Sequence, residues 1–246
     1  MITGAMSSPD RFDPGEAPAG ADDLDTEPST RDRLISAGEE LFATQGIEGV
    51  SLREITRHAG QANVSALQYH FGGRVGLLRA IVAKHAADTE PRRHALLDQY
   101  EAESQPDVRS LAGALVRPLV AKLSDPAGGR HYLQIVSDIY TRPDARAIAE
   151  LVPFDNPHHS MMRWNVLLDP LVADDEHTVR HARYPAMRFA FVELARRAAG
   201  PVRPDDSLFA SHVIDLVTAV LVAPPSAETT RLLTERDAVT ASQHRP

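Results

Sequence analysis

The sequence predicts an all-α protein, with a small N-terminal domain of three helices in a helix-turn-helix arrangement and a larger helical domain behind it. Apolar residues recur along most of the chain with the spacing of one face of a helix. Ser, Asp or Asn precede many of these stretches and Gly or Pro follow them, as at the starts and ends of helices. Residues 51–71, SLREITRHAGQANVSALQYHF, contain two short helical runs on either side of a turn.

The composition suits a globular protein without thiol chemistry. The chain has 246 residues, of which 43% are hydrophobic, and this is enough for a sizeable core. It has no cysteine, so disulfides, thiolate metal sites and cysteine nucleophiles are excluded, and we expect a reducing cytoplasm. The sequence has neither a signal-peptide apolar region nor an apolar run of about 18 residues, so no membrane partner is expected.

Charge is unevenly distributed, although the net charge of the whole chain is −8. Residues 1–30 hold seven acids and one base, which gives −6, whereas residues 31–87 hold seven bases and five acids, which gives +2. A mildly basic module inside an acidic chain is compatible with local phosphate contact but not with strong non-specific attraction to DNA.

The N-terminal elements follow from caps and breaks in the sequence. Residues 1–29 contain almost no large apolar side chains, so we expect a disordered acidic tail. Helices are expected at 30–45, 51–59, 63–71 and from 74 onward. Ser51 and Glu54 form a Ser-x-x-Glu capping box at the start of the second helix, and Asn63 can cap the third.

The remainder of the chain is also expected to be helical. Helices are expected at about 91–103, 107–123, 125–141, 144–151, 156–168, 174–199 and 207–223. Pro185 should kink the long helix that contains it, because proline removes an amide donor and clashes one turn back. The expected organisation is a tail at 1–29, a helix-turn-helix domain at 30–87, a second helical domain at 88–224 and a polar tail at 225–246.

Residues 51–74 have the chemistry of a helix-turn-helix that reads DNA. In this motif the second helix enters the major groove. Val64, Leu67 and Phe71 would pack that helix on its support and leave short polar side chains facing outward. Among such side chains, glutamine can pair bidentately with adenine. Flanking donors such as Arg74 would bind phosphates and fix the register.

These residues resemble the N-terminal domain of the tetracycline-repressor (TetR) family of bacterial transcription regulators. The resemblance covers about 55 residues and rests on an LF pair before a Gly, on SLREI, HAG and YHF, and on Gly-Gly-Arg before a Leu-Leu pair. It implies double-stranded operator DNA as a partner and the following DNA-facing set: Ser51, Asn63, Ser65, Ala66, Gln68, Tyr69, His70 and Arg74. The chain departs from the common form by one additional residue between HAG and YHF, by Gln68 where Tyr is frequent, and by Thr56 where Ala is usual.

Beyond residue 87 the resemblance implies a helical domain that forms a homodimer and binds a small-molecule effector. The two helices before residue 224 are apolar around most of their circumference and need more than one neighbour, so they are the expected dimer interface. The interface residues expected are Met187, Phe191, Leu194, Phe209, Val213, Val217 and Val220, unless both helices lie in the core of one chain. The side chains that could line an effector pocket are Tyr132, Tyr140, Phe154, Met161, Met162 and Trp164.

The expected function is that of a dimeric repressor that an effector releases from its operator. Two reading helices must meet successive major grooves about 34–36 Å apart, so an effector that favours another spacing lowers DNA affinity. The helix that begins at Arg74 would transmit the change, because it touches both domains. Two alternatives remain open: a ligand-independent regulator of the same family, and a helical small-molecule-binding protein or enzyme with a vestigial helix-turn-helix.

The sequence contains no motif that favours an enzyme. It has no glycine-rich phosphate loop, serine nucleophile elbow or HExxH motif. His158-His159 and the pair His177/His181 lack a third ligand at a suitable spacing. We therefore expect no catalytic residue, no metal and no cofactor.

Overall fold

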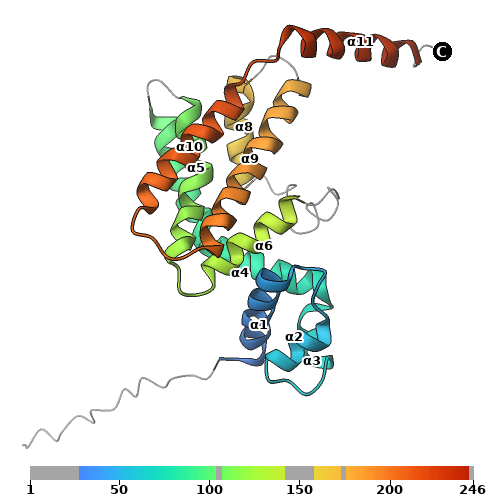
Figure 1. Cartoon of the computed structure of the whole chain (residues 1–246), viewed down its shortest axis with the longest axis vertical. Coiled ribbons are helices and arrows are strands. Elements are labelled where there is room, and N and C mark those ends of the chain that lie inside the picture. The colour runs from blue at the N-terminus through green and yellow to red at the C-terminus, as the bar shows by residue number, and fades with distance from the viewer. Residues whose placement is uncertain (1–27, 104–106, 142–157, 173–175, 244–246) are drawn as a thin grey trace, which may run out of the picture.

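The computed structural model describes residues 28–103, 107–141, 158–172 and 176–243, and within the last segment the side chains of residues 183–239. Every regular element in these ranges is a helix, which confirms the predicted all-α class (Figure 1). The predictions for the tail at 1–27, for a helix at 144–151 and for Phe154 lie outside the described residues.

The three N-terminal helices form where caps and glycines predicted them. They are α1 (Thr30–Gln45), α2 (Leu52–His58) and α3 (Ser65–Phe71). Ser29 Oγ accepts from the Asp32 amide, and Ser51 Oγ accepts from the Glu54 amide at 3.2 Å. Each hydroxyl satisfies an amide that the first turn of a helix leaves without a partner.

Helix α4 (Arg74–Ala102) continues through the expected break at Pro91. The separate helix predicted at 91–103 is therefore wrong. The proline lacks an amide donor, but Leu97 and Tyr100 beyond it are buried, as are Leu77 and Ile81 before it. Burial of side chains on both sides of Pro91 stabilises one continuous helix by more than the single missing hydrogen bond costs. This helix leaves the N-terminal helices and enters the body, so it belongs to both (Figure 1).

The body is a bundle of helices against which the second half of α4 packs (Figure 1). Its elements are α5 (Val108–Val120), the 3₁₀ helix η1 (Ala121–Ser124), α6 (Gly129–Thr141), α8 (Ser160–Val172), α9 (Glu176–Ala199) and α10 (Asp206–Val222). Helix α9 packs against α6 and α10, α5 packs against α4 and α10, and α1 reaches the body through α6. One hydrophobic core runs through the N-terminal helices and the body.

Five residues predicted at a dimer interface lie instead in the core of the chain itself. Met187, Phe191, Leu194, Val213 and Val217 are all 5% exposed or less. Phe191 stacks on Tyr140 with ring centroids 4.3 Å apart. These five side chains are covered within the chain itself, because α9 packs against α5, α6, α8 and α10, and α10 packs against α5 and α9. Phe209 and Val220 are half-buried.

The polar tail predicted after residue 224 contains a helix, α11 (Ala227–Gln243). Ser226 caps its start, since its hydroxyl accepts from the Thr229 amide at 3.2 Å. The helix lies at the end of the molecule opposite α1–α3 (Figure 1). In the part of the chain that the structure describes, no single helix has the length and apolarity to span a membrane; α10 and Ala227–Val239 reach that length and apolarity only when taken together, and they are bent by 51° to each other.

Candidate nucleic-acid interface

Helix α3 divides into a packed side and a bare side. Leu67 is fully buried and Phe71 is half-buried against the core. Gln68, Tyr69 and His70 are exposed, with Tyr69 at 86%. At this exposure the Tyr69 ring gains little of the stabilisation that burial usually gives a tyrosine, so packing does not explain its position.

The start of α3 is organised by a short polar turn. Asn63 Oδ1 accepts from the Ser65 amide and from the Ser65 hydroxyl, both at 2.9 Å. The cap predicted at Asn63 is wrong: α3 begins at Ser65, its N-cap residue is Val64 without a side-chain cap, and Asn63 forms a turn one residue earlier. Ser51, Asn63 and Ser65 are all exposed, so their polar groups remain accessible beside the bare side of α3.

Two of the predicted DNA-facing residues are placed differently. Ala66 is half-buried and packs on the core, because it lies next to Leu67 on the inner side of α3. Arg74 is turned inward: its guanidinium donates to the backbone carbonyls of Ile47 and Val50, the latter at 2.7 Å. It braces the turn between α1 and α2 and is not presented as a free phosphate donor.

Two bases that the sequence analysis did not select lie on the same surface. Arg53 and Arg57 are exposed on α2 and line an open groove that also includes Ser51, Thr56, Gln61 and Asn63. Their spacing of four residues places both guanidinium groups on one side of the helix. That spacing of two bases on α2 is the sequence signal for this pair.

The residues predicted to line an effector pocket lie in the interior of the body. Tyr132, Tyr140, Met161 and Trp164 are buried, and Met162 is half-buried. The indole N–H of Trp164 donates to the Leu111 carbonyl at 2.7 Å, so its polar group is already satisfied within the core. Whether the other side chains line a ligand site stays a prediction.

A buried arginine lies beside the two tyrosines. Arg93 is 4% exposed and donates to Glu90, to the Ser160 hydroxyl at 2.8 Å and to the Ala114 carbonyl at 3.2 Å. Burial lowers the pKa of its guanidinium, and the nearby charge of Glu90 opposes that effect. Charge and hydrogen-bonding capacity are therefore concentrated between α4, α6 and α8.

Burial raises the pKa of Tyr132 to about 12, and it also raises the pKa of Tyr140. Between the ordinary value of 10.0 and about 12, the unfolded chain releases the Tyr132 proton while the native chain keeps it. The contribution of the neutral Tyr132 phenol to stability is therefore fully present below pH 10 and is lost as the pH rises through this window. We expect Tyr132→Phe to lose less stability than the natural chain between about pH 10 and pH 12, as measured by urea unfolding. Equal losses in the two proteins would contradict this assignment.

The described residues contain no group of three or more His, Asp or Glu side chains placed to hold a metal ion. The side chains of His177 and His181 lie outside the described residues.

Comparison with known proteins gives a match to the N-terminal domain. Residues 34–81 match the family of bacterial regulatory proteins, tetR family. The chain is 38% identical over 56 residues to the probable HTH-type transcriptional regulator YttP of Bacillus subtilis and 39% identical over 54 residues to the HTH-type transcriptional regulator SrpR of Pseudomonas putida. These matches cover 23% and 22% of this chain, and only 27% and 25% of the relatives.

Solved structures extend the likeness of fold beyond that domain. Mycobacterium smegmatis AmtR superposes with a TM-score of 0.51 at 19% identity, covering 87% of this chain and 96% of AmtR. A tetR family protein from Shewanella sp. PV-4 also gives 0.51, at 14% identity, covering 79% of this chain and 98% of that one. The relatives that match the N-terminal domain are named as transcriptional regulators. The N-terminal domain of the chain, at residues 34–81, belongs to the TetR family of bacterial transcription regulators.

Proposed function

We propose that the chain is a sequence-specific DNA-binding regulator whose α3 helix reads an operator in the major groove. The observation that supports this most is the division of α3, on which Leu67 is fully buried while Gln68 and Tyr69 stand in solvent. A short helix with a bare polar side is what entry into the groove requires. Arg53 and Arg57 would add phosphate contacts next to it.

We propose that the working unit is a homodimer. Helix α10 keeps Leu208, Leu216 and Val222 exposed, at 71%, 41% and 50%. These residues lie on the side of the helix opposite its buried residues Val213 and Val217. A second copy related by a two-fold axis would cover them with the same surface and would place two α3 helices for successive major grooves.

We propose repression that a small molecule relieves. An effector held in the interior near Tyr132, Tyr140 and Met161 would need to bind one arrangement of the domains better than another. Operator DNA would then weaken effector binding by the same factor as the effector weakens DNA binding. The body would be the effector domain and the N-terminal helices the reading domain.

The decisive experiment is selection of random DNA duplexes by the full-length chain, followed by footprinting on genomic DNA. We expect a palindromic sequence with half-sites one helical turn apart, about 10 base pairs. If no sequence is enriched at low salt, DNA reading is rejected and the alternative of a helical binding protein with a vestigial helix-turn-helix is favoured.

The roles within the interface predict two different mutant phenotypes. Gln68→Ala should change base preference at one position of each half-site, with a loss of discrimination of about 1–3 kcal/mol. Arg57→Ala should weaken binding to every sequence alike and reduce the slope of log affinity against log salt by about 1 per subunit. The measurement is fluorescence anisotropy on a panel of single-base variants at several salt concentrations.

Arg231→Ala is the matched control, because it removes an exposed positive charge from α11, far from the proposed interface. It should leave both the salt slope and the base preference unchanged. Identical effects of Gln68→Ala and Arg57→Ala on every sequence would show that the assigned roles are wrong.

A further inference from the structure

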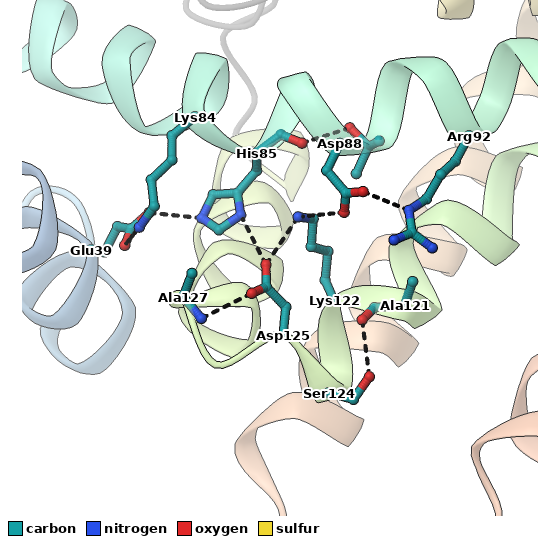
Figure 2. Close-up of polar contacts among 11 residues, drawn as sticks. Glu39, Lys84, His85, Asp88, Arg92, Ala121, Lys122, Ser124, Asp125 and Ala127 are labelled. Carbon is teal, nitrogen blue, oxygen red and sulfur yellow. Dashed lines mark hydrogen bonds and ion pairs between the residues drawn. The ribbon is translucent and has the colours of Figure 1, made fainter. Parts of the chain in front are cut away.

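A buried polar contact ties α1 to α4 (Figure 2). Glu39 of α1 is only 2% exposed, and its carboxylate accepts from Lys84 Nζ and from His85 Nε2, both at 2.7 Å. The imidazole is itself only 1% exposed. A carboxylate this deeply buried is strongly disfavoured without its donors, so the position of α1 depends on these two side chains.

The other side of the imidazole faces the turn that leads into α6. His85 Nδ1 lies 3.7 Å from Asp125 Oδ2, and Lys122 Nζ bonds the same carboxylate at 3.0 Å. Lys122 also pairs with Asp88 at 2.9 Å (Figure 2). His85 therefore lies between one carboxylate of the N-terminal helices and one carboxylate of the body.

The backbone of the same turn closes on Glu39. Gly128 has φ +94°, and a Cβ atom added to it would lie 2.5 Å from Glu39 Oε2 and 3.5 Å from Lys84 Nζ. The turn approaches the carboxylate closely because this residue is glycine, both for its backbone conformation and for space. Glu39 is thus enclosed by α4 on one side and by the turn before α6 on the other.

The imidazole also stacks on Tyr132 of α6. The ring centroids are 4.3 Å apart and the planes are inclined by 21°. Tyr132 is buried, and its phenol is close enough to Arg93 for that charge to oppose the rise in its pKa. His85 thus contacts α1 through Glu39 and the interior of the body through Tyr132.

We propose that His85 is a positioning residue that sets the orientation of α1–α3 on the body and passes a displacement of Tyr132 to Glu39. The contact set Glu39, Lys84, His85, Asp125 and Tyr132 is here named the α1 clasp. A change in the interior that moves the Tyr132 ring also moves the imidazole of His85 that stacks on it. The buried Glu39 carboxylate must then move with the imidazole, because no solvent is present to replace its donors. The consequence for operator release rests on the proposed function, but the orientation itself does not.

The experiment measures orientation directly and without DNA. The chain has no cysteine, so Arg57→Cys in α2 and Val166→Cys in α8 provide two unique positions for spin labels. Both residues are exposed, Val166 by 63%. Full-length labelled chain, diluted into excess unlabelled chain, gives the distance within one chain by double electron–electron resonance. The unaltered clasp should give a single narrow population.

Glu39→Gln keeps the shape of the side chain and removes its charge, whereas His85→Ala removes the ring. Both should replace the single narrow population by a broad or shifted distribution. Tyr132→Leu removes the stacked ring and should do the same, and Tyr132→Phe, which keeps the ring, should leave the population narrow. If Glu39→Gln and His85→Ala both retain the narrow population, the proposal is overturned. If Tyr132→Leu retains it, the link to α6 is overturned.

Val217→Ala separates positioning from loss of stability. Val217 is fully buried in α10, outside the α1 clasp, so this variant is destabilised without touching the clasp. It should keep the narrow population even where its thermal midpoint falls as far as that of His85→Ala. An equally broad distance distribution in Val217→Ala would mean that loss of stability alone broadens the distribution, and it would overturn the proposal.

The same variants distinguish this proposal from the proposed function. Failure to select any operator, together with a distribution that responds to Glu39→Gln, would reject DNA reading and leave the positioning role intact. Successful operator selection, together with an unresponsive distribution, would reject the positioning role alone.

Discussion

Gly76→Ala is expected to abolish operator binding and to destabilise the junction between α3 and α4 by about 3 kcal/mol, at the upper end of overpacking costs. A Cβ atom added at Gly76 would lie 1.7 Å from the Phe71 carbonyl oxygen and 2.8 Å from the carbonyl carbon. Both are backbone atoms, so no side-chain rotation can relieve the overlap. Helix α3 must move away from α4, and with it the bare side that carries Gln68 and Tyr69.

Gly72→Ala is the matched control in the same turn. Gly72 has φ +68°, but a Cβ atom there would meet nothing within 4 Å. It should cost only the strain of a left-handed residue, about 1–2 kcal/mol, and should leave the position of α3 unchanged. Chemical denaturation and binding to the selected operator measure the two effects. Equal losses of operator affinity in both variants would mean that strain in the turn, and not the overlap with Phe71, is what matters.

Local signals in the sequence were sufficient to predict the three helices of the N-terminal domain. Ser51 and Glu54 are three residues apart, and that spacing alone specifies a cap that the structure contains. Leu67 was identified as an anchor because its neighbours on the inner side of the helix are apolar, and it is fully buried. Such features depend on residues within one or two helical turns, so a single sequence reveals them.

The differences arise where distant residues decide the outcome. Arg74 has the character of a phosphate donor, but the carbonyls of Ile47 and Val50 are closer and bind it. Pro91 is a strong stop signal, yet the core on both sides keeps α4 continuous. Periodicity identified the apolar stripes of α9 and α10 correctly but could not say whether the chain or a second copy covers them.

The α1 clasp illustrates the same limit more sharply. Glu39 follows Gly38 on a helix whose pattern is explained by its apolar residues, and nothing local distinguishes it from the neighbouring Glu40. One is buried against His85, while the other pairs with His58 at the surface. Only the packing of α1 against α4 and against the turn before α6 separates the two carboxylates.

Glu90→Ala is expected to destabilise the body by about 3–5 kcal/mol, because it leaves the buried guanidinium of Arg93 without its counterion. The same carboxylate accepts from the Ser160 amide at 2.7 Å and from the Ser160 hydroxyl at 2.8 Å. Its removal therefore also leaves the first amide of α8 without an acceptor. Equilibrium unfolding in urea, followed by far-ultraviolet circular dichroism, measures the loss.

Glu101→Ala provides the comparison on the same helix. Glu101 pairs with Arg163, but its side chain is 46% exposed, so a loss of no more than about 1 kcal/mol is expected. A second comparison is Glu90→Ala combined with Arg93→Leu, which removes both buried charges and should recover part of the stability lost in the single variant. If Glu90→Ala unfolds at the same urea concentration as Glu101→Ala, then solvent reaches Arg93 in the native state and the interior between α4 and α8 is not closed. Recovery in the double variant would show instead that the cost is electrostatic and belongs to the unpaired guanidinium.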